Sequence, residues 1–281
     1  MSSTAAGTLF LVSTPIGNLG DISHRAVEVL SSAALILAED TRHSRRLLDH
    51  YGISTPVSSY HEHNEAKEAS RLVQRLGRGD SIALISDAGT PLISDPGSRL
   101  VDAALEAGVA VVPIPGASSV MAALVGSGLP LDRFTFFGFI PRKGRERTAA
   151  IADIVASRVT SVVFEAANRV AATLSALASA GAADRPAVIA RELTKQFEEF
   201  RRGTIAELEQ TCEKLAPRGE VVLVIAGVEP RSASEAELVA EAKKAREGGL
   251  SPRDVVDHLI RELGAPRNLA YRIAHGVEER P

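Results

Sequence analysis

One loop near the middle of the first half constrains the fold of this chain more than any other stretch. Residues 86–97 read SDAGTPLISDPG, and they follow a short apolar run, IALI, at residues 82–85. Such a run is typical of a buried strand of a parallel sheet, and residues 98–108 after the loop have the pattern of a helix that ends at a glycine. A loop at the carboxyl end of a strand in an open α/β sheet is where ligands bind. The sequence therefore predicts an α/β fold with a ligand site at this loop.

The composition of this loop also narrows the kind of ligand. Gly89 and Gly97 allow the backbone to come close to a ligand, whereas Pro91 and Pro96 stiffen the loop and remove amide donors. A phosphate cradle needs many free N–H groups and usually a lysine, but this loop has two aspartates and no lysine. We therefore expect a neutral or cationic ligand, the alternative being that the loop is only an elaborate turn.

Composition limits the class of protein. The chain has 281 residues, of which 45% are hydrophobic and 24% charged, as in a soluble globular protein of two domains or so. The net charge of −3 does not by itself indicate a nucleic-acid binder, although local basic patches are compatible with it. A single cysteine, Cys212, excludes an internal disulfide, and we expect a buried thiol and a cytoplasmic protein. Neither a signal peptide nor a membrane span is expected.

Strand and helix patterns alternate through the first half, which is typical of βαβ units and a parallel sheet. The predicted strands are residues 9–12, 34–38, 82–85, 109–114 and 134–138, with an edge strand at 57–60. The predicted helices are residues 22–30, 65–78, 98–108 and 120–126. A basic segment at residues 141–147 is interpreted as an interdomain linker. We therefore expect an N-terminal α/β domain at residues 1–140.

The second half is less regular. Strands are predicted at residues 160–164, 187–190, 197–203 and 221–226, and a helix at 168–180, so that a second α/β domain spans residues 141–228. Residues 229–281 form a helical extension of three short helices, in which Ser251 and Pro252 begin one helix and residues 263–266 turn into the last. Two short helices around a glycine turn resemble a helix-turn-helix, with a plain αα-hairpin as the alternative.

Several common kinds of site have no support. His61 and His63 are close in sequence but lack further ligands at metal spacing, and neither a nucleophile elbow nor a dinucleotide fingerprint is present. What remains is three loops at the carboxyl ends of strands, residues 13–21, 86–97 and 115–119, and a charged segment at 39–46. Together they predict one cleft with Glu39, Asp40 and Arg42 as polar walls. Alternatively, Glu39 and Asp40 only cap a helix.

These motifs carry a family resemblance. Residues 13–22 (STPIGNLGDI), 38–42 (AEDTR), 86–91 (SDAGTP) with 93–97 (ISDPG), 115–119 (PGASS) and 191–195 (RELTK) resemble, in this order, the tetrapyrrole (corrin/porphyrin) methylase family. Within it they resemble the branch that methylates small-subunit ribosomal RNA, and the tail resembles the helix-turn-helix extension of that branch. In the first loop, Ser13 and Pro15 stand where much of the family has glycine. We therefore expect this loop to shape the RNA pocket more than to grip a cofactor.

The resemblance implies a fold, an activity and a cofactor. The fold is two α/β domains of the tetrapyrrole methylase type, a class III methyltransferase, with S-adenosylmethionine in the cleft between them. The activity is transfer of a methyl group to the ribose 2′-hydroxyl of a cytidine in the decoding region of 16S ribosomal RNA, by a homodimer. The implied cofactor contacts are Ile16, Ala88, Gly89, Thr90, Ile93, Ser118, Ser119, Phe164, Leu193, Ile225 and Ala226.

The chemistry of methyl transfer agrees with this loop composition. A sulfonium donor is cationic and suits carboxylates, and an in-line displacement needs no metal but gains about 7–11 kcal/mol from alignment of donor and acceptor. A ribose hydroxyl is a weak nucleophile that gains from a base or a positive neighbour. The candidate catalytic residues are Asp40, Glu39, Glu192 and Lys195, with Asp40 and Lys195 as the preferred pair and Arg42 as a second cation.

RNA binding would depend on local basic clusters. The candidates are Arg42, Arg45 and Arg46, then Arg142, Lys143 and Arg145 in the segment 142–147, and Arg201 with Arg202. Two other functions stay open. One is methylation of a tetrapyrrole or corrin precursor, against which the basic segment and the extension count. The other is a non-catalytic nucleic-acid-binding protein, which would bind no S-adenosylmethionine.

Overall fold

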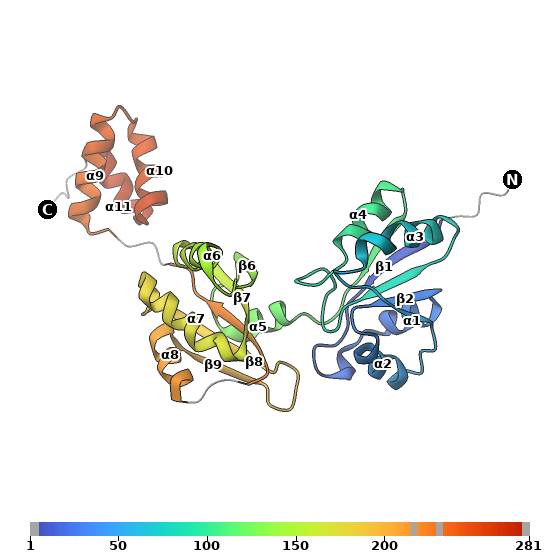
Figure 1. The fold of residues 1–281 in the computed structure, drawn as a ribbon. Helices are drawn as coiled ribbons and strands as arrows, with labels where there is room; N and C mark the ends of the chain where they lie inside the picture. The colour runs from blue at the N-terminus through green and yellow to red at the C-terminus, as the bar shows by residue number, and fades with distance from the viewer. Residues whose placement is uncertain (1–5, 215–217, 229–232, 277–281) are drawn as a thin grey trace. The chain divides into compact units, whose positions relative to one another are not determined.

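A computed structural model describes residues 6–214, 218–228 and 233–276 (Figure 1). These residues divide into two compact units, one up to Ala226 and the other from Gly227 onwards. The first unit contains two five-stranded sheets, and the second contains three helices. The finer domain limits that the sequence indicates, at residues 140 and 228, stay predictions.

The first sheet is parallel throughout. Its strands are β1 (Thr8–Val12), β2 (Leu35–Ala38), β3 (Val57–Ser59), β4 (Ile82–Ile85) and β5 (Ala110–Ile114), in the order β3-β2-β4-β1-β5. The expected edge strand at residues 57–60 does lie at an edge. Because ligand loops of a parallel sheet gather at the carboxyl ends of its strands, this topology places the loops after β1, β4 and β5 side by side.

Helices cover both faces of the first sheet, as Figure 1 shows. The helical segments are η1 (Leu19–Asp21), α1 (His24–Ser32), α2 (Thr41–His50), α3 (Glu65–Gly77) and α4 (Ser98–Glu106). Side chains of α3 and α4 pack with the sheet in one core cluster, and those of α1 and α2 pack with it in another. The central strands β2 and β4 are buried at every position, which explains their uninterrupted apolar sequences.

The second sheet is mostly antiparallel. Its strands are β6 (Phe134–Phe139), β7 (Thr160–Ala166), β8 (Pro186–Arg191), β9 (Glu199–Thr204) and β10 (Glu220–Ile225), in the order β6-β7-β10-β8-β9. β6 runs parallel to β7, and the other pairs are antiparallel. The strand at residues 134–138, expected at the end of the first sheet, therefore belongs to the second, because its backbone pairs with β7.

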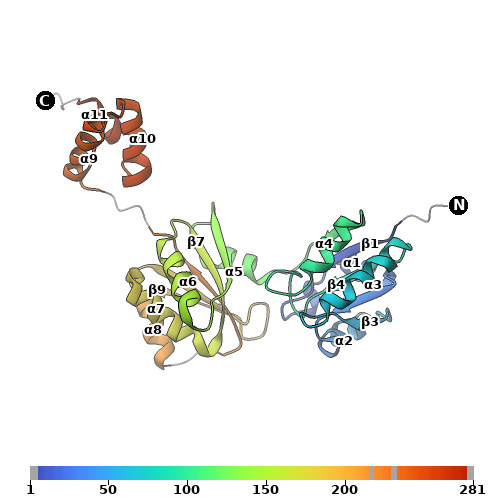
Figure 2. The same ribbon diagram turned by 45° about the horizontal axis from the view of Figure 1, so that its top comes forward.

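Helices also cover both faces of this second sheet, which Figure 2 shows from another side. They are α5 (Ser119–Ser127), α6 (Gly144–Ala156), η2 (Ala167–Arg169), α7 (Val170–Leu177), η3 (Ala178–Ala182) and α8 (Ile205–Lys214). Apolar residues of α6, α7 and α8 pack on one face, where Cys212 is buried as expected. The other face packs against α5 and Ile16, which comes from the loop after β1. The supposed linker at residues 141–147 runs into α6, whose first turn begins at Gly144.

The C-terminal unit has its own small core. It consists of α9 (Glu235–Glu247), α10 (Pro252–Leu263) and α11 (Arg267–His275), which bury Leu238, Val255 and Leu259 among their shared apolar side chains. Ser251 caps α10 by accepting a hydrogen bond from the backbone N–H of Asp254, as the sequence predicts. The short turn between α10 and α11 fits a helix-turn-helix and an αα-hairpin equally. In the described part of the chain, no helix has the length and apolarity to span a membrane.

Candidate active site

Three loops of the first sheet are joined to one another by hydrogen bonds. The backbones of Thr14 and Gly89 exchange two bonds, of 2.9 and 3.1 Å, which join the loop after β1 to the loop after β4. The hydroxyl of Thr90 accepts a bond of 3.4 Å from the Ser13 hydroxyl and donates one of 3.4 Å to the carbonyl of Ala117, in the loop after β5. The predicted meeting of these loops at one sheet edge is confirmed.

Left-handed backbone conformations gather in two loops that face each other. Gly89 has φ +80°, which suits a residue without Cβ, and a Cβ there would lie 3.3 Å from Cγ2 of Ile16. Four described non-glycine residues also have positive φ: Leu92 and Ser94 in the loop after β4, and Glu192 and Thr194 in the loop between β8 and β9. Such strained positions concentrate at functional sites.

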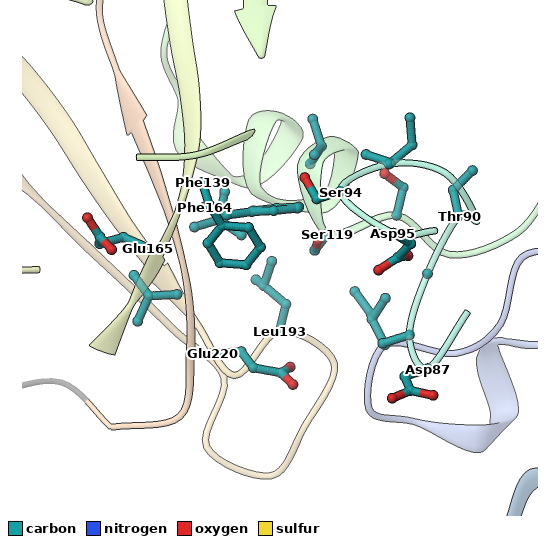
Figure 3. Close-up of a pocket in the computed structure, with 18 of the residues that line it drawn as sticks. Asp87, Thr90, Ser94, Asp95, Ser119, Phe139, Phe164, Glu165, Leu193 and Glu220 are labelled. Atoms are coloured by element: carbon teal, nitrogen blue, oxygen red, sulfur yellow. The ribbon is translucent and has the colours of Figure 1, made fainter. Parts of the chain in front are cut away.

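A cavity of about 390 Å³ lies between these loops and the second sheet. Figure 3 shows Phe164 and Leu193 on one side of it and Thr90, Ser94 and Asp95 on the other. Nine of the eleven predicted cofactor residues line the cavity, namely Ile16, Ala88, Gly89, Thr90, Ile93, Ser118, Ser119, Phe164 and Leu193. The structure thus brings segments together that are far apart in the sequence. Their roles in binding stay predictions.

Ile225 and Ala226, also predicted as cofactor contacts, lie elsewhere. Ile225 is fully buried in the core on the face covered by α6, α7 and α8, and neither residue is among the described residues around the cavity. These two positions were implied by the family resemblance alone, as the end of a predicted strand. Because β10 is antiparallel to β7, its first residue Glu220 pairs with Ala166 at the end of β7, and this beginning of β10 lines the cavity.

Three carboxylates stand at the wall formed by the first sheet: Glu39, Asp87 and Asp95. Burial, with the charge of Glu39 adding to it, raises the pKa of Asp95 from 3.8 to about 6. Burial, followed by the charge of Asp87, also raises the pKa of Glu39 above its usual range. Sequence reasoning placed Glu39 here and took the two aspartates of the loop as a sign of a neutral or cationic ligand, without including them among the site residues. Clustered acids that are partly desolvated favour a cationic ligand.

Asp40 does not face the cavity but caps helix α2. Its carboxylate accepts hydrogen bonds from the backbone N–H groups of Arg42, at 2.8 Å, and His43, at 3.3 Å. These bonds lower the pKa of Asp40, so its carboxylate is a poorer base than an ordinary aspartate. The capping alternative is therefore correct for Asp40, whereas Glu39 lines the cavity.

Lys195 and Glu192, the other two catalytic candidates, belong to an ionic cluster at the rim. The ammonium of Lys195 donates bonds of 3.0 Å to Glu192 and 2.7 Å to Glu220. Burial lowers the pKa of Lys195, but the bonds to these two carboxylates outweigh burial and raise it overall. The pKa of Glu192 is lowered, mainly by the backbone N–H of Glu220. A firmly protonated lysine and a stabilised carboxylate hold the loop between β8 and β9 against the start of β10.

Glu165 is a buried carboxylate near the end of β7. Its side chain has no exposed surface and lies 3.4 Å from the guanidinium of Arg169 and 4.0 Å from that of Arg147. It also accepts a bond of 2.6 Å from the hydroxyl of Thr173. Arg169 in turn donates to the carbonyl of Ile140. This network fixes the end of β7, which borders the cavity, to the chain between β6 and α6.

The predicted basic clusters differ in their surroundings. Arg42, Arg45 and Arg46 are exposed on α2, and Arg142, Lys143 and Arg145 are exposed at the start of α6. Arg201 and Arg202 instead serve the fold: Arg201 pairs with Glu199, and Arg202 donates to the carbonyls of Ser127 and Gly126 at the end of α5. Within the described ranges, no three His, Cys, Asp or Glu side chains group closely enough to hold a metal ion.

The arrangement fits a particular kind of small molecule. Ile16, Ile93, Phe164 and Leu193 supply apolar surface for a flat ring, and serine and threonine hydroxyls lie beside it. The carboxylates Glu39, Asp87 and Asp95, at the wall formed by the first sheet, supply negative charge for a positive centre. A molecule that joins an aromatic base to a sulfonium ion matches both the apolar surface and the carboxylates of the cavity.

Comparison with known proteins gives a consistent result. The model of the family described as Tetrapyrrole (Corrin/Porphyrin) Methylases matches residues 8–209. A protein of Synechocystis sp. named ribosomal RNA small subunit methyltransferase I is 44% identical over 275 residues, covering 97% of this chain and 99% of its own. A Pseudomonas aeruginosa protein of the same name is 44% identical, covering 96% and 97%.

Solved structures resemble the fold at low sequence identity. A cobalt precorrin-4 methyltransferase aligns with a TM-score of 0.60 at 18% identity, covering 78% of this chain and 94% of its own. A uroporphyrin-III C-methyltransferase of Thermus thermophilus, complexed with S-adenosylhomocysteine, aligns with a TM-score of 0.56 at 18% identity, covering 78% and 97%. At such identity these likenesses concern the fold alone.

Proposed function

Because this chain belongs to the tetrapyrrole (corrin/porphyrin) methylase family, we propose that it methylates 16S ribosomal RNA with S-adenosylmethionine as the donor. The acceptor is the ribose 2′-hydroxyl of a cytidine in the decoding region. The observation that carries the proposal is the length of the similarity: relatives named for methylation of small-subunit ribosomal RNA match almost the whole chain at 44% identity. The corrin and uroporphyrin enzymes share only the fold, at 18%.

The cavity of about 390 Å³ is the proposed donor site. Its apolar side receives the adenine, and the carboxylates Glu39, Asp87 and Asp95 offset the charge of the sulfonium. Ser118 contributes by capping α5, since its hydroxyl accepts from the backbone N–H of Met121 at 3.4 Å. The N-terminus of that helix then presents further N–H groups at the cavity wall.

The transfer itself is an in-line displacement. The ribose oxygen forms a bond to the methyl carbon while the carbon–sulfur bond breaks, its electrons stay on sulfur, and S-adenosylhomocysteine leaves. The hydroxyl proton must pass to a base, for which Glu39 is the proposed residue because it lines the cavity and has a raised pKa. This replaces the pairing of Asp40 with Lys195.

Methyl transfer to purified small subunits tests the proposal. The purified protein is incubated with S-adenosylmethionine labelled in its methyl group and with 30S subunits whose decoding region lacks the modification. We expect label in 16S RNA, and nucleoside analysis should identify it as 2′-O-methylcytidine. Label on a base would overturn the ribose assignment. Label on uroporphyrinogen III, offered in parallel, with none on RNA would favour the tetrapyrrole alternative.

Binding of RNA is proposed to depend on the exposed clusters on α2 and α6. Because phosphate contacts release counterions, the affinity for RNA should fall steeply as salt is raised. Reversing one charge in each cluster, with Arg45→Glu and Arg142→Glu, should weaken binding in a filter assay and leave S-adenosylmethionine binding unchanged.

A homodimer in the cytoplasm completes the proposal. Met121 and Val125 lie one turn apart on α5, and their apolar side chains are 52% and 72% exposed. A second copy that covers these side chains would remove them from water. Sedimentation velocity should give a dimer for the protein and a shift towards monomer for Val125→Asp.

A further inference from the structure

A second cavity, of about 260 Å³, borders the donor cavity. The two share one wall residue, Asp87. The second cavity is lined by the loop after β1, by one flank of α2 and by the end of β4, with Leu19 at its exposed rim. Neither the comparisons nor the proposed donor site assigns a ligand to it. A group held here would be separated from a bound methyl donor by little more than one side chain.

The flank of α2 that faces this cavity carries two unengaged polar side chains. Ser44 and Leu47 are buried against the sheet, and His43 and Arg46, three residues apart, line the cavity beside them. Arg42 and Arg45 are not among the residues that line the cavity. Among the described residues, none accepts a hydrogen bond from the side chain of His43 or Arg46 or lies in ion-pair contact with it, although the Asp40 carboxylate interacts electrostatically with His43. Both are therefore available to an anion.

The opposite wall is closed by Lys195. A Cβ added at Gly17 would meet Cγ of Lys195 and would lie 2.8 Å from its Cε, so the lysine stem lies directly across the first loop. Its ammonium is already bonded to Glu192 and Glu220, and Glu220 lines the donor cavity. Lys195 thus separates the two cavities on this side, whereas Arg46 lines the second one without an ion-pair partner among the described residues.

We propose that the second cavity receives the acceptor nucleotide of the RNA, with its flanking phosphate on Arg46 and His43. The inference rests on the proposed function, since it places the substrate of that reaction. The reason is that Asp87 lines both cavities. A ribose whose phosphate is bound by side chains of α2 directs its hydroxyl past Asp87 into the donor cavity. The first loop, with Pro15 and Gly17 on the lining, shapes the pocket around this ribose.

Two variants test this placement of the nucleotide, one by removing a contact and the other by filling the cavity. Arg46→Ala removes the proposed phosphate contact, and Leu19→Trp fills the cavity from a side chain that is 37% exposed, which should not disturb the core. Arg25→Ala is the matched control, because it removes one exposed arginine from α1, on the same face of the sheet. For each protein, calorimetry measures S-adenosylmethionine binding, and methyl transfer to unmodified 30S subunits gives kcat and KM.

The placement predicts a separation of the two readouts. Arg46→Ala should raise KM for the 30S subunit about tenfold or more, as loss of a charge-assisted bond does, and Leu19→Trp should abolish transfer. Both should bind S-adenosylmethionine as the unchanged protein does, and Arg25→Ala should differ in neither. Normal transfer by Leu19→Trp, or equal effects of Arg46→Ala and Arg25→Ala, would overturn the placement. Absence of transfer by the unchanged protein would instead refute the proposed function.

Discussion

The charge of the methyl donor should make its binding depend on pH through Asp95. Burial and the neighbouring Glu39 hold the pKa of Asp95 at about 6 instead of 3.8. At pH 7 the carboxyl is mostly ionised, whereas at pH 5 about ten carboxyls are protonated for each ionised one. A sulfonium ion in the same cavity favours the ionised form, so S-adenosylmethionine should bind more tightly as the pH rises from 5 to 7.

The size of this effect follows from the same two pKa values. If the bound cation returns the pKa of Asp95 to about 3.8, the carboxyl is ionised in the complex at both pH values. Binding at pH 5 must then remove a proton from about ten of every eleven molecules, which weakens the affinity roughly tenfold, or about 1.4 kcal/mol. S-Adenosylhomocysteine has no sulfonium charge, so its affinity should change much less over this range.

Titration calorimetry with both ligands at pH 5, 6 and 7 measures this difference. In Asp95→Asn, the dependence for S-adenosylmethionine should become nearly flat. The exposed acid Asp153 on α6 provides a control, since Asp153→Asn should keep the full dependence. If both ligands weaken in parallel on acidification, or if Asp95→Asn keeps the tenfold change, then the carboxyl does not face the positive centre and the orientation of the donor argued above is wrong.

Other changes test single contacts. Glu165→Ala leaves Arg169 without its buried partner and should cost about 3–5 kcal/mol in urea unfolding. Asp40→Ala should lower the urea midpoint of unfolding through loss of the α2 cap, whereas Asp40→Asn should keep near-normal methyl transfer; a collapse of kcat in the latter would restore Asp40 as the base. Gly126→Ala should cost about 1–3 kcal/mol, measured by thermal unfolding, because its Cβ would meet the ring of Phe200.

The first sheet could be predicted almost entirely from the sequence, for local reasons. Its strands are buried on both faces, so each is a short apolar run between turn residues, and its loops carry the glycines and caps that end and begin elements. A parallel sheet then places all these loops at one edge. Seven of the nine lining positions that the family resemblance implies lie in these loops, whereas Phe164 and Leu193 come from the second sheet.

The second sheet could not be predicted in the same way, because strand direction is set by tertiary pairing. β10 has an apolar sequence that suits either direction, and its antiparallel pairing with β7 and β8 brings Glu220 to the cavity and takes Ile225 away from it. β6 likewise reads as a continuation of the first half, and only its pairing with β7 assigns it to the second sheet. Both differences arise from the pairing of strands in the folded protein, which the residue pattern of a single strand does not indicate.

The sequence also could not predict which of Glu39 and Asp40 lines the cavity. Both follow β2 directly, and both are acids that suit either a helix cap or a catalytic base. Successive side chains at a strand end point in opposite directions, so one of the pair must turn from the cavity, but composition does not tell which. In the structure, α2 begins at Thr41, and backbone N–H groups of its first turn donate hydrogen bonds to Asp40. Glu39 instead lines the cavity together with Asp87 and Asp95. Burial, followed by the charge of Asp87, raises the pKa of Glu39 above its usual range, which makes its carboxylate a better base than an ordinary glutamate.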